Sequence, residues 1–504
     1  MRLKSQLFVI AAIITALLAY QVILMLVSKA HYDTPDDNKN GVSQRAFPYP
    51  YRCGLAICSD TDWTGTIAEF LTIMEYLNTS NETVLGTGLG LEIGNSFYGT
   101  IHDDYFGFNI QDPEMVEVIT EMIRLGYMDC IHSFTQAENR EEIVATVQEL
   151  VRRNCQLDVW VNHSNNASNV GSWACNQGDN VTSDIYHTDF SVPRLGLRFF
   201  WTKDVTSIVG QGRALTLPAY FSGFDRCNKL GSLKNFALKE MVKFSLAPMW
   251  GRYSTRLHND LIWPVELEDG QRVFGFSRCN MSSGQRSCAG GLAENLRPGV
   301  LQALVDSEGY MVIYTHIGKN DGYPYLSEEL CGNLKGLAER SRGGEILVAT
   351  TSRLLNYYAN RKYLEWHSEV HDGKTLICVD SISDPVRGKF EPTVEDLQGA
   401  TFYVEDPDEV VMLIGGEPYT GFSRNGTDHT RRKSVTIPWV GLESIDELML
   451  EYRDRGLFGK VGQGSTTRLG QDHSLLGALI HGDQPLVALV RSGRSRVSQS
   501  PRIH

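Results

Sequence analysis

Short apolar runs alternate with amphipathic segments from about residue 47 to residue 363. Apolar runs of about four to eight residues are typical of buried strands, and an apolar period of about 3.6 residues is typical of helices. The pattern predicts strands at 55–59, 89–93, 128–131, 157–161, 197–201, 273–276 and 311–314, and helices at 67–77, 113–125, 140–153 and 326–341. Such alternation favours parallel strands joined by helical crossovers, in an α/β barrel or a doubly wound sheet.

The pattern of apolar and polar residues changes after residue 366. Short β-rich runs are separated by Gly, Pro and Asp turns, which predicts a small antiparallel domain. These runs lie at 375–380, 400–404, 410–414 and 434–437. The expected domains are a start and anchor at 1–30, a stem at 31–46, a barrel at 47–365 with inserted loops at 171–270, a β-rich accessory domain at 366–450, and a partly disordered tail at 451–504.

The N-terminal segment predicts a membrane anchor. Residues 7–28 form a run of 22 residues without a charge, which as a helix spans a hydrocarbon core of about 30 Å. Arg2 and Lys4 precede the run, so the positive-inside rule places the N-terminus in the cytosol and the rest of the chain in the periplasm, a lumen or the extracellular space. A cleaved signal peptide and a buried core helix are the alternatives.

Composition and charge narrow the possible partners. The formal net charge is -13, which argues against a nucleic-acid partner because a phosphate backbone would repel the protein. Ten cysteines suit an oxidising compartment, and Cys279 and Cys288, which bracket a Ser/Gly-rich loop, are the expected disulfide pair rather than Cys53 and Cys58. Possible glycan acceptors, relevant only in a eukaryotic secretory pathway, include Asn78, Asn81, Asn180, Asn280 and Asn425.

Polar residues follow several of the predicted strands. Asp60 and Asp62 end the first, His132 the third, His163 the fourth and His316 the last. In an α/β barrel the carboxyl ends of the strands meet at one mouth, so these side chains can face a single pocket. One Asp and two His can hold a zinc-like ion, while a second carboxylate and a third histidine can act as general base and general acid. The combination predicts hydrolysis of an amide or ester.

Each of these residues also has an ordinary structural interpretation. The two aspartates can cap the following helix, and each histidine can be a buried, hydrogen-bonded core residue or part of a loop. His187, near Asp184 and Asp189, is a further candidate ligand. Agreement between several strand ends favours the chemical interpretation over these separate structural ones.

These motifs resemble the polysaccharide deacetylase superfamily, the NodB-like enzymes of carbohydrate esterase family four, in a divergent branch. The resemblance covers about residues 50–363 and implies a distorted (β/α) barrel that binds a divalent metal. It implies that Asp60 is the general base, that Asp62 and His132 are metal ligands, and that His316, in Tyr314-Thr315-His316, is the general acid. The segment 344–350 and the Tyr357-Tyr358 pair are similar to the closing strand and helix of that barrel.

One departure from the family pattern concerns the second metal-binding histidine. The family places it four residues after the first, where this chain has Gln136. We therefore expect His163, on the next strand, to supply the missing ligand, so that Asp62, His132 and His163 hold the ion, with zinc as the expected metal.

Three functions are consistent with the sequence. The leading one is removal of acetyl groups from an extracytoplasmic polysaccharide or glycan by attack of a metal-bound water. An inactive glycan-binding protein on the same barrel is the second, and Gln136 is its best support. A glycoside hydrolase that uses two carboxylates, such as Asp60 and Glu92, is the third. The expected partners are an acetylated glycan and the membrane, through residues 7–28.

Overall fold

The computed structural model describes residues 40–61, 63–102, 106–163, 166–171, 175–216, 259–282, 286–319 and 325–459, with Ala219 and scattered positions between 15 and 32. None of the helices in these ranges is long and apolar enough to cross a bilayer. Most of the expected anchor at 7–28 and the chain beyond residue 459 lie outside the described residues.

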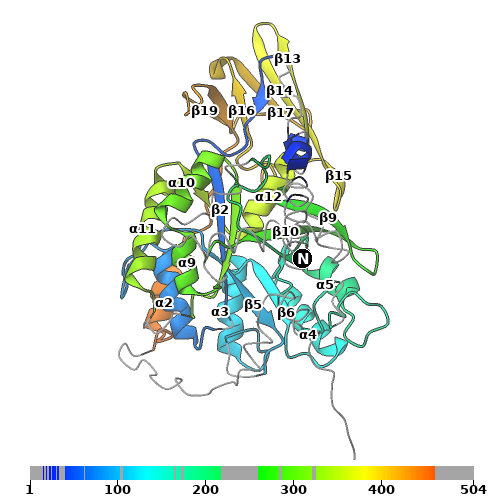
Figure 1. Ribbon diagram of the computed structural model, residues 1–504, viewed down its shortest axis with the longest axis vertical. Helices are drawn as coiled ribbons and strands as arrows, with labels where there is room; N and C mark the ends of the chain where they lie inside the picture. Colours follow the sequence, from blue (N-terminus) through cyan, green and yellow to red (C-terminus); the bar gives the residue numbers. More distant parts are fainter. Residues whose placement is uncertain are drawn as a thin grey trace, which may run out of the picture. The chain divides into compact units, whose positions relative to one another are not determined.

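The central feature of the described chain is a closed barrel of seven parallel strands (Figure 1). In barrel order they are β2 (Cys53–Asp60), β5 (Gly94–Gly99), β6 (Cys130–Phe134), β7 (Val159–Trp160), β8 (Phe199–Thr206), β10 (Arg272–Cys279) and β11 (Tyr310–Thr315). The last strand, β11, pairs in parallel with the first and closes the ring. The predicted α/β barrel is confirmed. A short strand, β9 (Ile262–Glu266), adds to β10 in the antiparallel direction.

The barrel is distorted beside β2. Along one edge, β2 pairs with β11 from Gly54 to Ser59. Its other edge is shared, because β12 (Ile346–Val348) pairs with residues 53–55 and β5 with residues 58–60. On this edge, β12 therefore pairs with the start of β2, and β5 pairs with its end, next to Asp60.

Helices join and cover the strands (Figure 1). They are α2 (Ile67–Asn78), α3 (Pro113–Arg124), α4 (Arg140–Arg152), α5 (Thr188–Leu195), α9 (Ala289–Asn295), α10 (Pro298–Ser307), α11 (Glu328–Arg342) and α12 (Thr351–Lys362). In four of them, the residue before the helix accepts a hydrogen bond from a backbone N–H of the first turn through its side chain. These capping residues are Thr66, Asp112, Asn139 and Ser327. This capping fixes the start of each helix, and the four predicted helices are confirmed to within about two residues.

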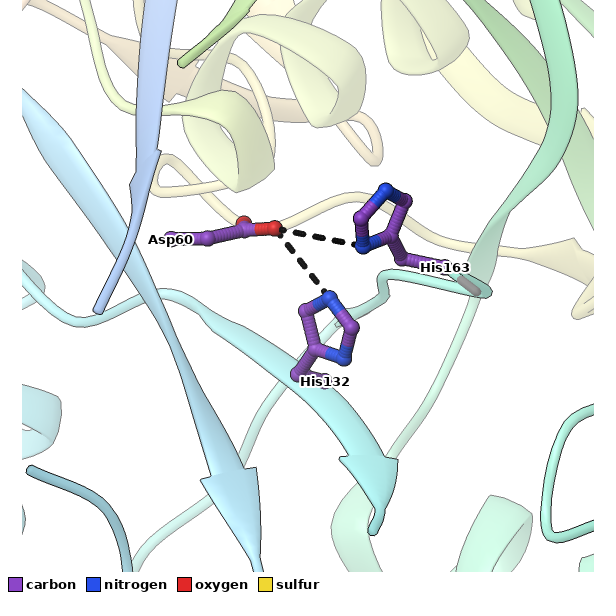
Figure 2. Close-up of side chains that lie close together, drawn as sticks. All are labelled: Asp60, His132 and His163. Atoms are coloured by element: carbon purple, nitrogen blue, oxygen red, sulfur yellow. Dashed lines mark ion pairs between the residues drawn. The ribbon is translucent and has the colours of Figure 1, made fainter. Parts of the chain in front are cut away.

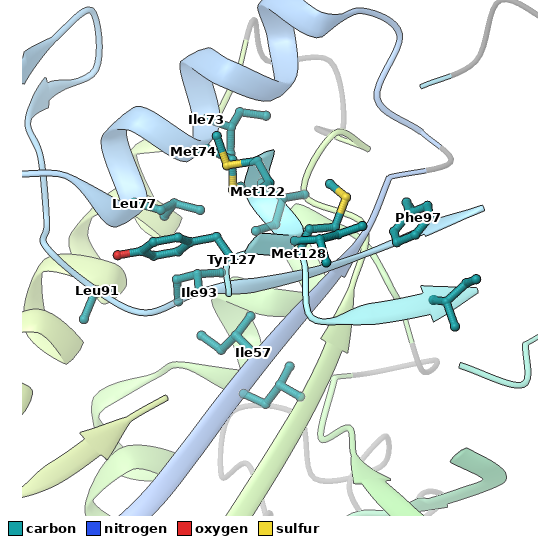
Figure 3. Close-up of a cluster of buried hydrophobic side chains, with 14 of the residues drawn as sticks. Ile57, Ile73, Met74, Leu77, Leu91, Ile93, Phe97, Met122, Tyr127 and Met128 are labelled. Carbon is teal, nitrogen blue, oxygen red and sulfur yellow. The ribbon is translucent and has the colours of Figure 1, made fainter. Parts of the chain in front are cut away.

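Alternation along the strands separates two cores. In β2, Ala56 and Cys58 belong to an inner cluster within the barrel, whereas Leu55 and Ile57 belong to an outer cluster shared with the helices. The outer cluster packs side chains of α2 and α3 against the barrel, as Figure 3 shows for Ile57, Ile73, Met74, Leu77, Leu91, Ile93, Phe97, Met122, Tyr127 and Met128. Because successive side chains point to opposite faces, Asp60 continues the inward series of β2.

The second strand of the barrel is not where the sequence predicted it. The apolar residues Leu89, Leu91 and Ile93 are buried, but the backbone of this segment bonds to the end of α2 instead of to a strand. Leu89 N–H donates to the Tyr76 carbonyl at 2.8 Å, and Leu91 N–H donates to the Leu77 carbonyl at 2.9 Å. The strand follows directly, as β5.

The β-rich region after the barrel contains two sheets around its own core. One contains β13 (Leu364–His371), β14 (Lys374–Asp384), β15 (Gly388–Phe390), β17 (Val410–Ile414) and β18 (Glu417–Tyr419). The other contains β1 (Ser43–Gln44), β16 (Thr401–Val404), β19 (Ser423–Asn425) and β20 (Lys433–Thr436). All pairs are antiparallel except β14 with β17. β1 comes from the segment that was expected to be a stem.

Smaller elements complete the described chain. They are the two-stranded β3 (Glu82–Thr83) and β4 (Gly86–Thr87), the 3₁₀ turn η4 (Pro407–Glu409) and the helix α13 (Asp446–Asp454). α13 lies against α2, because Met449 and Tyr452 enter the outer core and Arg453 forms an ion pair with Glu75 of α2.

Two further expectations fail in the structure. Cys279 does not bond to Cys288, because its thiol lies 3.6 Å from the carbonyl oxygen of Ile208, to which it donates. Asn78 and Asn280 are buried, and the Asn78 side chain binds the backbone of Ile93. These two asparagines cannot accept a glycan in the folded chain.

Candidate metal centre

Three side chains, carried by β2, by β6 and by the segment after β7, point toward one another at the carboxyl end of the barrel (Figure 2). Asp60 ends β2, His132 lies in β6, and His163 follows β7. Asp60 Oδ2 lies 3.1 Å from His132 Nε2 and 4.0 Å from His163 Nδ1. All three belong to one group that could hold a metal ion. The predicted convergence of His132 and His163 with an aspartate is therefore present in the structure.

Asp60 is the carboxylate that faces both histidines. Its side chain is 1% exposed, and its second oxygen, Oδ1, accepts a hydrogen bond from the Ser96 hydroxyl of β5. Burial alone raises the pKa of this carboxyl, but His132, His316 and Arg278 outweigh burial and hold the pKa well below its ordinary value. Asp60 therefore carries a negative charge, which suits a cation bound beside it.

Two contacts at the other nitrogen of His132 favour opposite tautomers. The backbone N–H of Ser133 donates to Nδ1 at 2.9 Å, which places the ring proton on Nε2. The Ser133 hydroxyl lies 3.2 Å from the same nitrogen and can accept an Nδ1–H, which leaves the lone pair of Nε2 directed at Asp60. Metal binding through Nε2 requires the second arrangement.

His163 continues the inward series of β7 beyond Val159 and Val161. Its side chain is 16% exposed, so it is the most open of the three. Burial, together with the neighbouring His132, holds the pKa of His163 well below its ordinary value. A neutral imidazole is the form that binds a metal.

The geometry passes a simple test for a bound ion. Ligand atoms at about 2.0–2.2 Å from a tetrahedral ion lie about 3.3–3.6 Å apart. The 3.1 Å pair of Asp60 and His132 is close to this spacing, and the 4.0 Å pair of Asp60 and His163 needs to contract by about 0.5 Å. Asp60 Oδ2 and His132 Nε2 are both buried, and neither makes a directed hydrogen bond with any residue that the structure describes. A cation between them would satisfy both atoms.

His316 faces the same carboxylate oxygen as the two other histidines. Its Nε2 is 4.0 Å from Asp60 Oδ2. Its Nδ1 is 2.6 Å from the Ser287 carbonyl, which can only accept, so Nδ1 carries the proton. Nε2 then accepts a hydrogen bond from the Tyr314 hydroxyl at 2.9 Å. The structure thus brings the predicted acid to the site and fixes its tautomer.

Sequence reasoning missed three residues around the site. Ser96 binds Asp60, while Tyr314 contacts both His316 and His163, with its hydroxyl 3.3 Å from His163 Nε2. The Arg278 guanidinium lies 4.2 Å from the ring centres of Tyr314 and Trp201. Tyr314 and Arg278 each occupy the next inward position after a buried residue of β11 or β10, so strand alternation was the available signal.

Other predicted residues lie elsewhere. Asp62 falls outside the described residues. Gln136 accepts a hydrogen bond from the backbone N–H of His102. His187 is not a ligand, because its ring is buried against Trp160, Nε2 lies 2.7 Å from the Ser168 carbonyl, and Nδ1 lies 2.8 Å from the Ser191 hydroxyl.

Comparisons with known proteins give no match that bears on the site. Protein-family models, curated proteins and solved structures gave no significant match to this chain. The residues and their arrangement are therefore the basis for proposing a function.

Proposed function

We propose that this chain is a metal-dependent hydrolase that removes acetyl groups from an extracytoplasmic polysaccharide or glycan. The observation that supports the proposal is the meeting of Asp60, His132 and His163 at one mouth of the barrel, with His316 at 4.0 Å from the same carboxylate. Three ligands and a separate acid are the groups that hydrolysis of an acetamide or acetate ester needs.

In this proposal Asp60, His132 and His163 hold the ion, which we take to be zinc because one carboxylate and two imidazoles suit it. A bound divalent ion lowers the pKa of a coordinated water and polarises the acyl carbonyl. Both oxygens of Asp60 are engaged in the site, which favours Asp60 as the ligand. Asp62 is then the second carboxylate and the proposed general base, the reverse of the roles that the family resemblance implied for the two aspartates.

His316 is the proposed general acid. The Ser287 carbonyl holds its Nδ1–H, so His316 would act as an acid only after Nε2, on the side of Asp60, has taken up a proton released by the attacking water, and that proton is the one that would move to the leaving group. Protonation of the leaving nitrogen or oxygen at that position completes bond cleavage. Residues 7–28 are the proposed anchor, which holds the barrel against the outer side of a membrane.

Acetate release from N-acetylated and O-acetylated oligosaccharides by the full-length protein tests the proposal. We expect activity that is lost on chelation and restored by zinc, and that falls at least about 100-fold in Asp60→Asn and in His132→Ala. His367→Ala, which alters an exposed histidine of β13, should retain full activity. Normal acetate release by either site variant would refute the assignment.

The two alternatives give different results in the same preparation. A glycan-binding protein without activity would bind the oligosaccharides and release no acetate. A glycoside hydrolase would generate new reducing ends and ignore chelation. Its proposed second carboxylate is poorly placed, because Glu92 precedes β5 and pairs with Arg353 of α12. Glu92 lies about 13 Å along the chain from Ser96, the neighbour of Asp60, at about 3.3 Å per residue.

A further inference from the structure

Two tight turns meet at the mouth of the barrel beside the site. After β2, the Thr64 N–H donates to the Thr61 carbonyl at 2.8 Å, and after β11 the Lys319 N–H donates to the His316 carbonyl at 3.1 Å. Hydrogen bonds between residues three apart close β-turns. One turn therefore carries Trp63 three positions after Asp60, and the other carries Lys319 three positions after His316.

The two turns pack against each other without space for another side chain. A Cβ atom on Gly318 would lie 2.8 Å from Thr64 Oγ1 and 2.9 Å from the Trp63 carbonyl oxygen. Within the second turn, the Ile317 N–H donates to the Ser59 hydroxyl of β2 at 3.0 Å. The Lys319 carbonyl is also bound, by the Ala289 N–H at 3.1 Å. These contacts hold the rim in one arrangement.

Trp63 is exposed on this rim. Its side chain is 53% exposed, although tryptophan is usually well buried. The Lys319 ammonium lies 4.2 Å from the centre of the Trp63 ring, a cation–π contact that fixes the indole from one side. Trp63 lies three positions after Asp60, so their Cα atoms are at most about 11 Å apart. A large aromatic surface is therefore presented to solvent beside the reacting groups.

We infer that Trp63, steadied by Lys319, is the binding platform for a sugar ring next to the residue that loses its acetyl group. This inference rests on the proposed function and adds a subsite that binds a second sugar residue of the polymer. A pyranose ring has an apolar face of C–H groups and an edge of hydroxyls. An aromatic ring can cover the apolar face while the hydroxyls remain solvated or meet polar groups such as the Lys319 ammonium.

Loss of the Trp63 indole should affect the binding of oligomers and of single sugars differently. A monomer can fill only the reacting position, whereas an oligomer places a neighbouring ring on Trp63. Loss of the indole should therefore weaken the binding of an oligomer by about five- to tenfold, from the stacking contribution alone. The turnover number and the binding of the monomer should stay within about twofold, because the site residues themselves are unchanged.

The test compares the N-acetylglucosamine hexamer with N-acetylglucosamine, using full-length wild type, Trp63→Ala, Trp63→Phe and the control Val181→Ala, which alters an exposed apolar residue elsewhere. Calorimetric Kd values are measured in a His316→Ala background, which keeps the three proposed ligands and removes the proposed acid, and KM and kcat with His316 intact. We expect a higher Kd and KM for the hexamer in Trp63→Ala only, with near-normal values in Trp63→Phe. Thermal denaturation checks that every variant is folded.

Each other outcome of this experiment either supports or overturns the role of Trp63 as a binding platform. An unchanged Kd for the hexamer in Trp63→Ala, or no binding of the hexamer by the wild type, overturns the platform even if acetate is released. An equal loss for hexamer and monomer in folded Trp63→Ala also overturns it, because it shows a disturbed reaction site. Binding of the hexamer that depends on Trp63, without acetate release by the wild type, supports the platform and refutes the proposed hydrolase.

Discussion

A buried carboxylate at the other end of β6 makes the stability of the barrel depend on pH. Asp129 is 6% exposed, and one of its oxygens accepts the Ser352 N–H of α12 at 2.7 Å. The other oxygen, Oδ1, makes no hydrogen bond with the described residues. Burial outweighs the bond from Ser352 and raises the pKa of Asp129 to about 6. The folded chain therefore binds a proton here more tightly than the unfolded chain does.

The size of the effect follows from the two pKa values. The ordinary value is 3.8 and the folded value about 6. The difference of about 2.2, at about 1.36 kcal/mol for each pKa unit, corresponds to about 3 kcal/mol. Because the folded pKa is raised, this stabilisation is fully present below about pH 4, declines as the pH rises toward 6, and is absent at neutral pH.

Asp129→Asn removes the ionisation while keeping an oxygen that can accept the Ser352 N–H. We expect the free energy of unfolding of the variant, relative to wild type, to rise by about 3 kcal/mol between pH 4 and pH 7. Urea denaturation followed by tryptophan fluorescence at closely spaced pH values measures this difference. Asp306→Asn, at an exposed carboxylate of α10, serves as the control and should follow wild type. A difference between Asp129→Asn and wild type that does not change with pH would refute the reasoning.

Three further predictions address the site and its support. His163→Ala should abolish stoichiometric zinc binding, measured by elemental analysis after dialysis, and a full complement of zinc would exclude His163 as a ligand. Ser133→Ala should lower zinc affinity by about 10–100-fold, because it removes the acceptor for the His132 Nδ1–H. Competition with a chelating dye measures this, and an unchanged affinity would contradict the tautomer argument. Arg198→Met should cost about 3–5 kcal/mol in urea denaturation, because it leaves the buried Asp384 carboxylate without its cation. Arg198→Met combined with Asp384→Leu should recover most of that loss, and no recovery would contradict this explanation.

The barrel could be predicted because its strands and helices have separate signatures in the sequence. Apolar periodicity predicted helix starts at residues 67 and 113, and in the structure both helices begin there, capped by Thr66 and Asp112. The segment 89–93 misled the prediction, because its buried leucines serve a loop that bonds to α2. The same error concealed Ser96, which could be recognised as an inward neighbour of Asp60 only if β5 began at Gly94.

The histidines of the site could be predicted because each lies at the end of a strand, where position along the chain determines direction. His187 shows the limit of that reasoning, since its partner Ser191 lies one helical turn later in α5 and its partner Ser168 is brought to it by folding of a loop. Cys279 shows a similar limit. Sequence separation allows a loop to close on Cys288, but it does not fix the direction of the thiols.

The shared edge of β2 has a consequence for the motions of the molecule. β2 is hydrogen-bonded to β11, β12 and β5, so its amides can exchange with deuterium only when several neighbouring strands separate together. Exchange from β2 should therefore report the global opening of the barrel, whereas amides of the two rim turns can exchange through local fluctuations. Asp60 is thus attached to a strand that opens only with the whole barrel, while Trp63, three residues later, lies on a packed turn that can still open locally.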